Sequence, residues 1–257
     1  MRVPAGGFEA GIEAVAVVVP ARDEEERVRA CLESVRAALA RRKLPGVIVL
    51  VAHHCTDRTG PRALEVLAGP GERVLADDSP TVATARRAGT AAAVATLSTL
   101  FPGVPENRTW LLSTDADSVV PPTWIEDVDR HARRGAAAVA GLVHLTGWEG
   151  ATPAAREAYR AILRAGLRRN GHDHVYGANL AVRLDAYRDV GGWPNVVPGE
   201  DSALVAALRR RGWPVTGARD VWVRTSGRRT PRAEGGLGSL LNQLTSGTPA
   251  VSPSFES

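Results

Sequence analysis

Cysteine is scarce in this 257-residue sequence, and long apolar runs are absent from it. Its two cysteines, Cys31 and Cys55, are too few for a disulfide framework, so we expect both to be reduced core or loop residues. No apolar stretch approaches the ~18 residues of a membrane helix, and the N-terminal segment lacks the apolar core of a signal peptide. These absences predict a cytoplasmic protein without a transmembrane segment; peripheral contact at the inner membrane face stays open.

Lysine is nearly missing as well, because Lys43 is the only one and arginine supplies the rest of the side-chain positive charge. The formal net charge is +4, and arginines crowd residues 209–232, where Asp220 is the only acid. This segment is interpreted either as a solvated basic face or as a surface for an anionic ligand or membrane headgroups. Nucleic acid is not an expected partner, since basic and aromatic residues do not alternate and no known binding motif occurs.

Glycine-rich phosphate-binding signatures are missing too. No G-x-G-x-x-G follows Val19 and no P-loop pattern occurs, which argues against a dinucleotide oxidoreductase or a P-loop enzyme. A sugar nucleotidyltransferase would need a Gly-rich, basic loop after the first apolar run, whereas "VVVPARDEEE" is acidic there. We therefore disfavour these three classes.

Short apolar runs alternate with helical patterns in the first half of the chain. The runs predict buried strands, and the helical spacing between them predicts helices, the first of which Asp23 is expected to cap. The expected strands are residues 14–19, 47–51, a short one around 74, 109–113 and 136–143, and the expected helices are about 24–40, 61–67, 84–100 and 153–170. This order predicts an α/β fold with a Rossmann-like, mostly parallel sheet flanked by helices.

A single domain is expected over residues 1–257, because chains of this length commonly form one large α/β unit. Residues of about 14–145 form its first half, and residues of about 146–232 build the other wall of a cleft. Over about 233–257, Gly, Ser, Thr and Pro become frequent, so we expect a loose C-terminal tail.

Two acids, Asp115 and Asp117, end the apolar run in "LLSTDADS", with Ala116 keeping the turn small. Residues two apart on an extended segment project to the same side, so both carboxylates can share one ligand at the carboxyl edge of the sheet. Hard oxygen donors suit Mg²⁺ or Mn²⁺, which keep positions open for waters and substrate phosphates. A turn in which both acids cap backbone amides is the alternative.

A second acidic pair, Glu200 and Asp201, stands at an expected helix start beside Pro198 and Gly199. Helix capping requires only one acid. The other acid could act as a general base that removes a proton from an attacking hydroxyl.

These motifs, in this order, resemble the family 2 glycosyltransferases of the GT-A fold over roughly residues 14–230. "VAVVVPARDEEERVRACLES" is similar to the first strand and nucleotide loop of that family, "LLSTDADS" to its D-x-D strand, and "YGANLAVRLDAYRDVGGWPNVVPGEDSALVAALRRRGW" to its acceptor-side segment. The resemblance implies inverting, metal-assisted transfer of one hexosyl or N-acetylhexosaminyl unit from a nucleoside-diphosphate sugar, with a UDP-sugar as the expected donor. The Q-x-x-R-W signature of processive synthases is absent, which favours a single transfer.

The same resemblance implies roles for individual residues. Asp201 would be the catalytic base with Glu200 as its neighbour, and Asp117 would bind the metal with Asp115 close by. The nucleotide pocket would be formed by Pro20, Ala21, Arg22, Asp23, His53, Arg86, Asp115, Ala116 and Asp117. The sugar or acceptor would lie near His174, Tyr176, Gly177, Ala178, Asn179 and Trp193.

The sequence departs from the family pattern at two places. His53 and His54 stand where many relatives carry an acid that reads the nucleobase, and no histidine follows His174 to serve as a late metal ligand. Arg228 or Arg229 could meet the diphosphate instead, because a guanidinium binds phosphate with two parallel hydrogen bonds.

The acceptor is not defined by the sequence: a small molecule, a lipid-linked intermediate and a carrier-linked intermediate all stay open, with natural-product or cell-envelope chemistry as a working expectation. A binding protein for nucleotide-sugars without catalysis is the rival from another class, and retention of Asp201 beside Asp117 argues against it.

Overall fold

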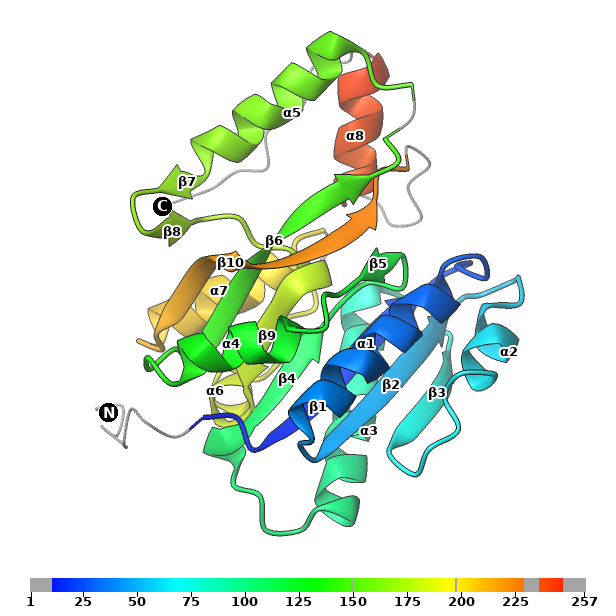
Figure 1. Cartoon of the computed structure of the whole chain (residues 1–257), viewed down its shortest axis with the longest axis vertical. Coiled ribbons are helices and arrows are strands. Elements are labelled where there is room, and N and C mark those ends of the chain that lie inside the picture. The colour runs from blue at the N-terminus through cyan, green and yellow to red at the C-terminus, as the bar shows by residue number, and fades with distance from the viewer. Residues whose placement is uncertain (1–10, 149, 197, 229–235, 247–257) are drawn as a thin grey trace.

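The strands and helices alternate along the chain, as Figure 1 shows for the computed structural model, which describes residues 11–148, 150–196, 198–228 and 236–246. The strands are β1 (Ala14–Ala21), β2 (Gly46–His53), β3 (Glu72–Asp77), β4 (Thr109–Ser113), β5 (Ser118–Val119), β6 (Ala138–Thr146), β7 (Leu167–Arg168), β8 (Gly171–His172), β9 (Leu180–Arg183) and β10 (Val215–Ser226). The helices are α1 (Val28–Arg42), α2 (Thr59–Leu64), α3 (Val82–Leu100), α4 (Trp124–Ala132), α5 (Pro153–Ala165), α6 (Leu184–Asp189), α7 (Glu200–Arg210) and α8 (Leu237–Ser246), with 3-10 turns η1 (Glu106–Arg108) and η2 (Gly177–Asn179).

One large sheet dominates the part of the chain that the structure describes, with strand order β3-β2-β1-β4-β9-β6-β10-β5. β1 pairs in parallel with β2 and β4, and β6 pairs in parallel with β10, whereas β9 runs antiparallel between β4 and β6. The predicted α/β fold with a mostly parallel sheet is therefore confirmed. Because the parallel strands all point one way, the loops after β1, β2 and β4 gather at one edge.

The core is built by alternation along the strands. In β1, Val15, Val17 and Val19 face a cluster that also contains residues of α1 and α4, while Ala14, Ala16 and Val18 face a cluster with residues of α3. β1 is buried along its whole length, which is why it reads as a continuous apolar run in the sequence. Figure 1 shows α1 and α4 in front of the sheet and α3 and α7 behind it.

An arm of two helices stands beyond the carboxyl ends of β6 and β10 (Figure 1). α5 and α8 pack there around a separate cluster that contains Trp148, Tyr159 and Leu241. The predicted loose tail is thus wrong for residues 237–246, which form α8; residues 247–257 lie outside the described part of the chain. Leu237, Leu240, Leu241 and Leu244 have helical spacing, which explains why this segment folds onto α5.

Two expected helices differ from the observed ones. α1 begins at Val28 rather than near residue 24, because Asp23 has a φ of 53° and accepts hydrogen bonds from the Thr56–Asp57 loop instead of capping a helix. α5 ends at Ala165 rather than at residue 170, because β7 and β8 pair as an antiparallel hairpin immediately afterwards. The first change places a polar loop, rather than a helix end, at the carboxyl end of β1.

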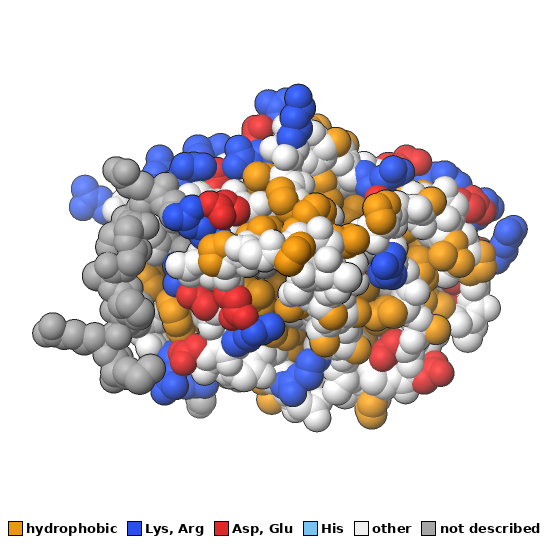
Figure 2. Space-filling view, turned by 90° about the horizontal axis from the view of Figure 1, so that it is seen from below, with side chains coloured by type: hydrophobic (Ala, Val, Ile, Leu, Met, Phe, Trp, Pro, Cys, Tyr) orange, Lys and Arg blue, Asp and Glu red, His pale blue; other side chains and the backbone are white. Residues whose placement is uncertain are grey.

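The face away from the two-helix arm is seen in Figure 2, where hydrophobic, basic and acidic side chains lie interspersed. No field of one sign covers this face of the described chain. None of the helices that the structure describes is long and apolar enough to span a membrane.

Candidate active site

The two acidic pairs lie at the same edge of the sheet and are connected by one buried arginine. Arg86 of α3 donates from Nη2 to Asp115 Oδ1 at 2.7 Å and from Nε to Glu200 Oε1 at 3.2 Å. Its Nη1 donates to the Ser113 hydroxyl and, at 3.3 Å, to the Gly177 carbonyl. Arg86 is 4% exposed, so these carboxylates and not water compensate its charge. Arg86 was expected near the base or diphosphate; its described partners are the acids and the loops that carry them.

The D-x-D segment is a turn and not an extended strand. The Ser118 amide donates to the Asp115 carbonyl at 2.9 Å, which closes the turn directly after β4. The premise that Asp115 and Asp117 lie two apart on extended backbone is therefore wrong. The two acids have different partners, because Asp115 pairs with Arg86 whereas Asp117 contacts Arg228 and Thr225.

Asp117 is the more buried of the two acids, with 12% of its side chain exposed against 39% for Asp115. Burial, followed by repulsion from Asp115, raises the pKa of Asp117 to about 6, although Arg228 and the Thr225 hydroxyl act in the opposite direction. Cys31 lies below the turn, where its thiol donates to the Asp115 carbonyl at 3.4 Å. Burial raises the pKa of this thiol, and Asp117 raises it further, so Cys31 is an inert core residue as expected.

This carboxylate pair fits a hard divalent cation. The negative charge of the buried Asp117 requires a nearby positive charge. The guanidinium of Arg228, 3.2 Å from Asp117 Oδ2, shows that a cation fits there. Two oxygen donors leave most positions of an octahedral ion for phosphate oxygens and water. The residues present therefore suit Mg²⁺ or Mn²⁺ held by Asp117, with Asp115 close by.

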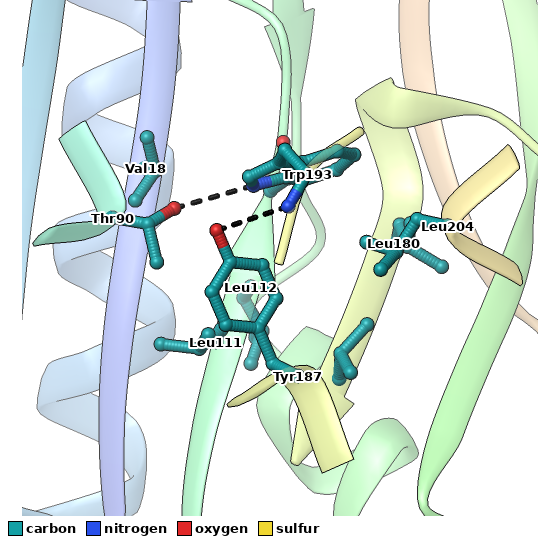
Figure 3. A pocket seen from close by; sticks show the side chains of 10 residues that line it. Val18, Thr90, Leu111, Leu112, Leu180, Tyr187, Trp193 and Leu204 are labelled. Carbon is teal, nitrogen blue, oxygen red and sulfur yellow. Dashed lines mark hydrogen bonds between the residues drawn. The ribbon is translucent and has the colours of Figure 1, made fainter. Parts of the chain in front are cut away.

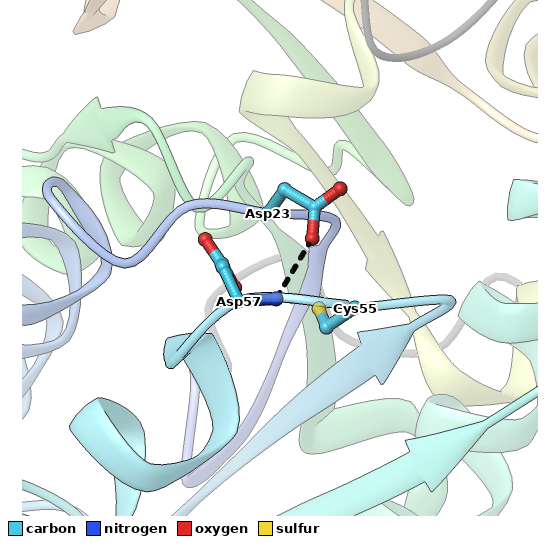
Figure 4. Close-up of side chains that lie close together, drawn as sticks. All are labelled: Asp23, Cys55 and Asp57. Atoms are coloured by element: carbon cyan, nitrogen blue, oxygen red, sulfur yellow. Dashed lines mark hydrogen bonds between the residues drawn. The ribbon is translucent and has the colours of Figure 1, made fainter.

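Another cluster of possible ligands lies in the neighbouring loop. Ligand atoms of Asp23, Cys55 and Asp57 lie within 4.8 Å of one another. Figure 4 shows these three side chains close together in the two loops. Asp23 Oδ1, however, accepts from the backbone amides of Thr56 and Asp57, and the Cys55 thiol donates to the Ala21 carbonyl at 3.3 Å. The cluster is thus an arrangement that ties the loop after β2 to the loop after β1.

The second acidic pair begins α7. Gly199 precedes it with a φ of 100°, a conformation that favours glycine and lets the chain turn into the helix. Asp201 Oδ2 accepts from the Gly177 amide at 2.8 Å, and its side chain is partly exposed. Burial raises the pKa of Glu200, although the charge of Arg86 opposes the shift. Glu200 therefore joins Arg86 in the interior, and Asp201 is the acid of this pair with access to solvent.

The predicted nucleotide loop follows β1. Pro20 and Ala21 complete this strand, Arg22 is exposed, and Asp23 holds the loop after β2 as described above. His53 stands at the end of β2 and Asp77 at the end of β3. The Nδ1 atom of His53 lies 2.9 Å from Asp77 Oδ2, within hydrogen-bonding distance. Although burial favours the neutral acid, hydrogen bonds from Ser79 and His53 together lower the pKa of Asp77. Asp77 is therefore ionised and accepts at this contact, which favours the His53 tautomer with its proton on Nδ1 and with Nε2 as an acceptor.

The predicted acceptor residues are mainly engaged inside the protein. His174 is buried and its Nε2 lies 2.8 Å from the Leu163 carbonyl of α5, and Tyr176 stacks on it with ring centroids 5.9 Å apart. Asn179 accepts from Trp124 Nε1 at 2.9 Å and donates to the Leu142 carbonyl at 2.9 Å. Ala178 belongs to the core, and Gly177 bonds to both Arg86 and Asp201. These contacts position the Gly177 turn; direct contact with a sugar stays a prediction.

Trp193 is 5% exposed and closes a small cavity below the site. Figure 3 shows its Nε1 donating to Thr90 Oγ1 at 3.3 Å and its amide donating to the Tyr187 hydroxyl at 3.3 Å. The Arg86 guanidinium lies 5.4 Å from the indole centroid. The cavity has a volume of about 10 Å³, enough for one water molecule and far too small for a sugar. The described contacts of Trp193 therefore help to position the Arg86 guanidinium, which packs on the indole ring.

Several contact residues were not foreseen from the sequence. Glu24 forms a two-pronged ion pair with Arg228, Thr225 donates to Asp117 at 3.2 Å, and Asp77 orients His53. The sequence could have indicated Asp77 and Thr225, because polar residues at the carboxyl ends of strands often bind ligands in such sheets. Asp77 ends β3, and Thr225 is the last residue but one of β10. The other arginine predicted at the diphosphate, Arg229, lies outside the described residues.

The family of the chain follows from its sequence. Residues 13–245 match the family model described as "Glycosyltransferase like family 2", so the chain belongs to this family and the resemblance noted above is confirmed. A comparison with curated protein sequences finds no match.

Solved structures of similar fold include a mannosyltransferase and a glucosyl-3-phosphoglycerate synthase. A mannosyltransferase, PcManGT from Pyrobaculum calidifontis in complex with GDP-Man and Mn²⁺, has a TM-score of 0.60 at 17% identity, over 90% of this chain and 60% of that one. S. aureus TarS 1-349 in complex with UDP-GlcNAc has a TM-score of 0.58 at 11% identity, over 91% of this chain and 71% of that one.

A third similar structure is glucosyl-3-phosphoglycerate synthase from Mycobacterium tuberculosis with Mn²⁺, UDP and glucosyl-3-phosphoglycerate, with a TM-score of 0.51 at 16% identity, over 98% of this chain and 88% of that one. At such identities the likeness concerns the fold, and it confirms the predicted GT-A arrangement. The chain covers less than two thirds of the mannosyltransferase, namely 60% of its length.

Proposed function

We propose that this protein transfers one sugar from a nucleoside-diphosphate sugar to a hydroxyl or amine acceptor, with inversion, and that a UDP-sugar is the donor. The observation that carries the proposal is the junction of the two acidic pairs: Arg86 bonds to Asp115 on one side and to Glu200, next to Asp201, on the other. The proposed diphosphate site and the proposed general base are thus connected through Arg86 at the carboxyl edge of the sheet.

Asp201 is the proposed general base. Its side chain is partly exposed and its Oδ2 is held by the Gly177 amide, so the carboxylate has a fixed direction and access to an incoming hydroxyl. Removal of the acceptor proton by Asp201 would accompany attack on the anomeric carbon from the face opposite the diphosphate. A single displacement of this kind inverts the configuration.

Asp117 and Asp115 are the proposed holders of the diphosphate through Mg²⁺ or Mn²⁺. When bound, such an ion supplies Lewis-acid stabilisation of the charge that develops on the leaving nucleoside diphosphate. Arg228, whose side chain is 22% exposed beside Asp117, can donate to the same phosphates. The metal-bound structures of PcManGT and of the mycobacterial synthase support the presence of a divalent ion.

The preference for UDP over CDP as donor nucleotide rests on His53. Ionised Asp77 favours the tautomer with the proton on Nδ1, in which Nε2 is an acceptor at the carboxyl edge of the sheet. An acceptor suits the ring N–H of uracil or guanine and not the unprotonated ring nitrogen of cytosine. Structures of similar fold hold UDP-sugars and GDP-mannose, which agrees with this division.

The acceptor is proposed only as a class: a small molecule, a lipid-linked intermediate or a carrier-linked intermediate. The sugar is likewise proposed only as a class, namely a hexosyl or an N-acetylhexosaminyl unit.

A turnover assay tests the proposal. The protein is incubated with UDP-, GDP- and TDP-sugars and Mn²⁺, and released nucleoside diphosphate is measured with and without an acceptor panel. We expect Asp201→Asn to lower turnover by about 10²–10⁴-fold while nucleotide affinity stays within about twofold. The matched control is Asp189→Asn, an acid of α6 that pairs with Arg211 on the surface. Nucleotide binding without any turnover in the wild-type protein would instead favour a non-catalytic binding protein.

A further inference from the structure

Arg228 follows directly after a tightly held stretch of backbone. The Gly227 amide donates to the Thr146 carbonyl at 2.7 Å, and a Cβ on Gly227 would meet the Trp148 backbone at 2.9 Å. This close approach fixes the chain at the end of β10. The Arg228 side chain, by contrast, is 22% exposed and reaches back across the site from this anchored point.

The guanidinium of Arg228 has two unequal attachments. It forms a fork on Glu24, in which Nη1 donates to Oε2 at 2.7 Å and Nη2 donates to Oε1. Its contact with Asp117 is a single one, from Nη2 to Oδ2 at 3.2 Å. The Glu24 fork is therefore the stronger attachment, and the Asp117 contact can be lost while Arg228 stays beside the site.

Charge makes this second contact important. The carboxylates of Glu24, Asp115 and Asp117 act on one another in a small buried region. Asp115 has Arg86 as its cation, so Arg228 is the cation that serves Asp117 among the described residues. Asp117 is also the carboxylate that would hold a divalent ion, so the guanidinium of Arg228 and the ion would compete for it.

We propose that Arg228 is a built-in counter-cation that occupies the metal side of Asp117 in the free protein and is displaced from it when a divalent ion arrives with the nucleotide. This inference deepens the proposed function, because it concerns the order of events at the same site. Free metal competes with an attached guanidinium and binds weakly. A nucleoside diphosphate gives Arg228 a new anionic partner, so metal and nucleotide bind together.

The direct test measures Mn²⁺ binding by electron paramagnetic resonance in the absence of nucleotide. We expect Arg228→Gln to bind free Mn²⁺ at least tenfold more tightly than the wild type. Arg209→Gln, which removes the same charge from the exposed end of α7, should bind within about twofold of the wild type. The double variant Arg228→Gln, Asp117→Asn should lose this increase in Mn²⁺ affinity, which would show that the additional binding occurs at Asp117.

Two further arms keep the test decisive. Arg228→Lys retains the charge but not the fork, so we expect an intermediate affinity and, in case Arg228→Gln folds poorly, it supplies the comparison. In the wild type, saturating UDP should raise the Mn²⁺ affinity of the protein site by at least tenfold, and Arg228→Gln should reduce this coupling.

Several results would overturn the proposal: equal Mn²⁺ affinity of wild type and Arg228→Gln, weaker binding by the variant, no measurable Mn²⁺ binding by either, or a gain that persists without Asp117. None of these readouts requires turnover. A protein that binds Mn²⁺ as expected but transfers no sugar would refute the proposed function and leave the role of Arg228 intact.

Discussion

Replacing Asp117 by asparagine should stabilise the folded protein at neutral and alkaline pH. The carboxylate is 12% exposed and its pKa is raised to about 6, whereas an aspartate in the unfolded chain titrates near 3.8. A difference of about two pKa units corresponds to ~3 kcal/mol, at ~1.4 kcal/mol per unit. An amide of the same shape removes this cost, because its single oxygen can accept from Arg228 while its NH2 group faces the Thr225 hydroxyl, which can also accept a hydrogen bond.

The sign follows from proton binding. Between pH of about 4 and 6 the folded state binds the proton of Asp117 more strongly than the unfolded state, so rising pH lowers the stability of the wild type through this window. The advantage of Asp117→Asn should therefore be near zero at pH 3, about half of its final value at pH 5, and ~3 kcal/mol at pH 8.

Urea unfolding without metal, at pH 5 and pH 8, measures both quantities. Asp115→Asn is the informative comparison, since it takes a partner from buried Arg86 and should destabilise the protein. A wild type as stable as Asp117→Asn at pH 8, or an advantage that does not change with pH, would show that Asp117 is not the strained acid described here.

Two other substitutions test the supports of the site. Arg86→Met leaves Asp115 and Glu200 without their shared cation and should lower the free energy of unfolding by ~3–5 kcal/mol. The control Arg164→Met, on the surface of α5, should change it by less than ~0.5 kcal/mol. Equal effects of the two substitutions in urea unfolding would contradict the central role of Arg86. Asp77→Asn removes the carboxylate that fixes the His53 tautomer, so the ratio of UDP affinity to CDP affinity, measured by calorimetry, should fall about tenfold. An unchanged ratio would show that His53 does not recognise the base.

The strands and the acids of the site could be predicted because their signals are local. β1 and β4 are buried along their whole length, which appears in the sequence as apolar runs, and Asp115 follows the second of these runs closely. The predicted start of α7 is confirmed for the same reason, since Gly199 and two acids mark a helix N-terminus.

The partners of these acids could not be predicted, because they come from distant parts of the chain. Arg86 and Glu200 are 114 residues apart, and Glu24 and Arg228 are 204 residues apart. No periodicity reports such a pairing. The sequence suggested a cation shared by the two acids, but it did not reveal that each acid also contacts an arginine of its own, Arg86 at Asp115 and Arg228 at Asp117.

Two fold errors had local signals that composition concealed. Arg169 and Asn170 form the two-residue turn between β7 and β8, and the sequence signal for this turn is the Asn-Gly pair at residues 170–171. Leu237, Leu240, Leu241 and Leu244 have helical spacing in a segment rich in Gly and Ser, and packing on α5 stabilises α8 there.

The central claim is that Asp115 and Asp117 hold a nucleoside diphosphate through a divalent ion. Calorimetric titration of the protein with UDP, GDP, TDP and CDP, each with and without Mn²⁺ and alongside Asp117→Ala, tests it most directly. We expect tight binding of UDP only when Mn²⁺ is present, at least tenfold weaker binding of CDP, and loss of the UDP signal in Asp117→Ala. Absence of metal-dependent binding to all four nucleotides would contradict the account and leave the two acids as parts of a structural turn.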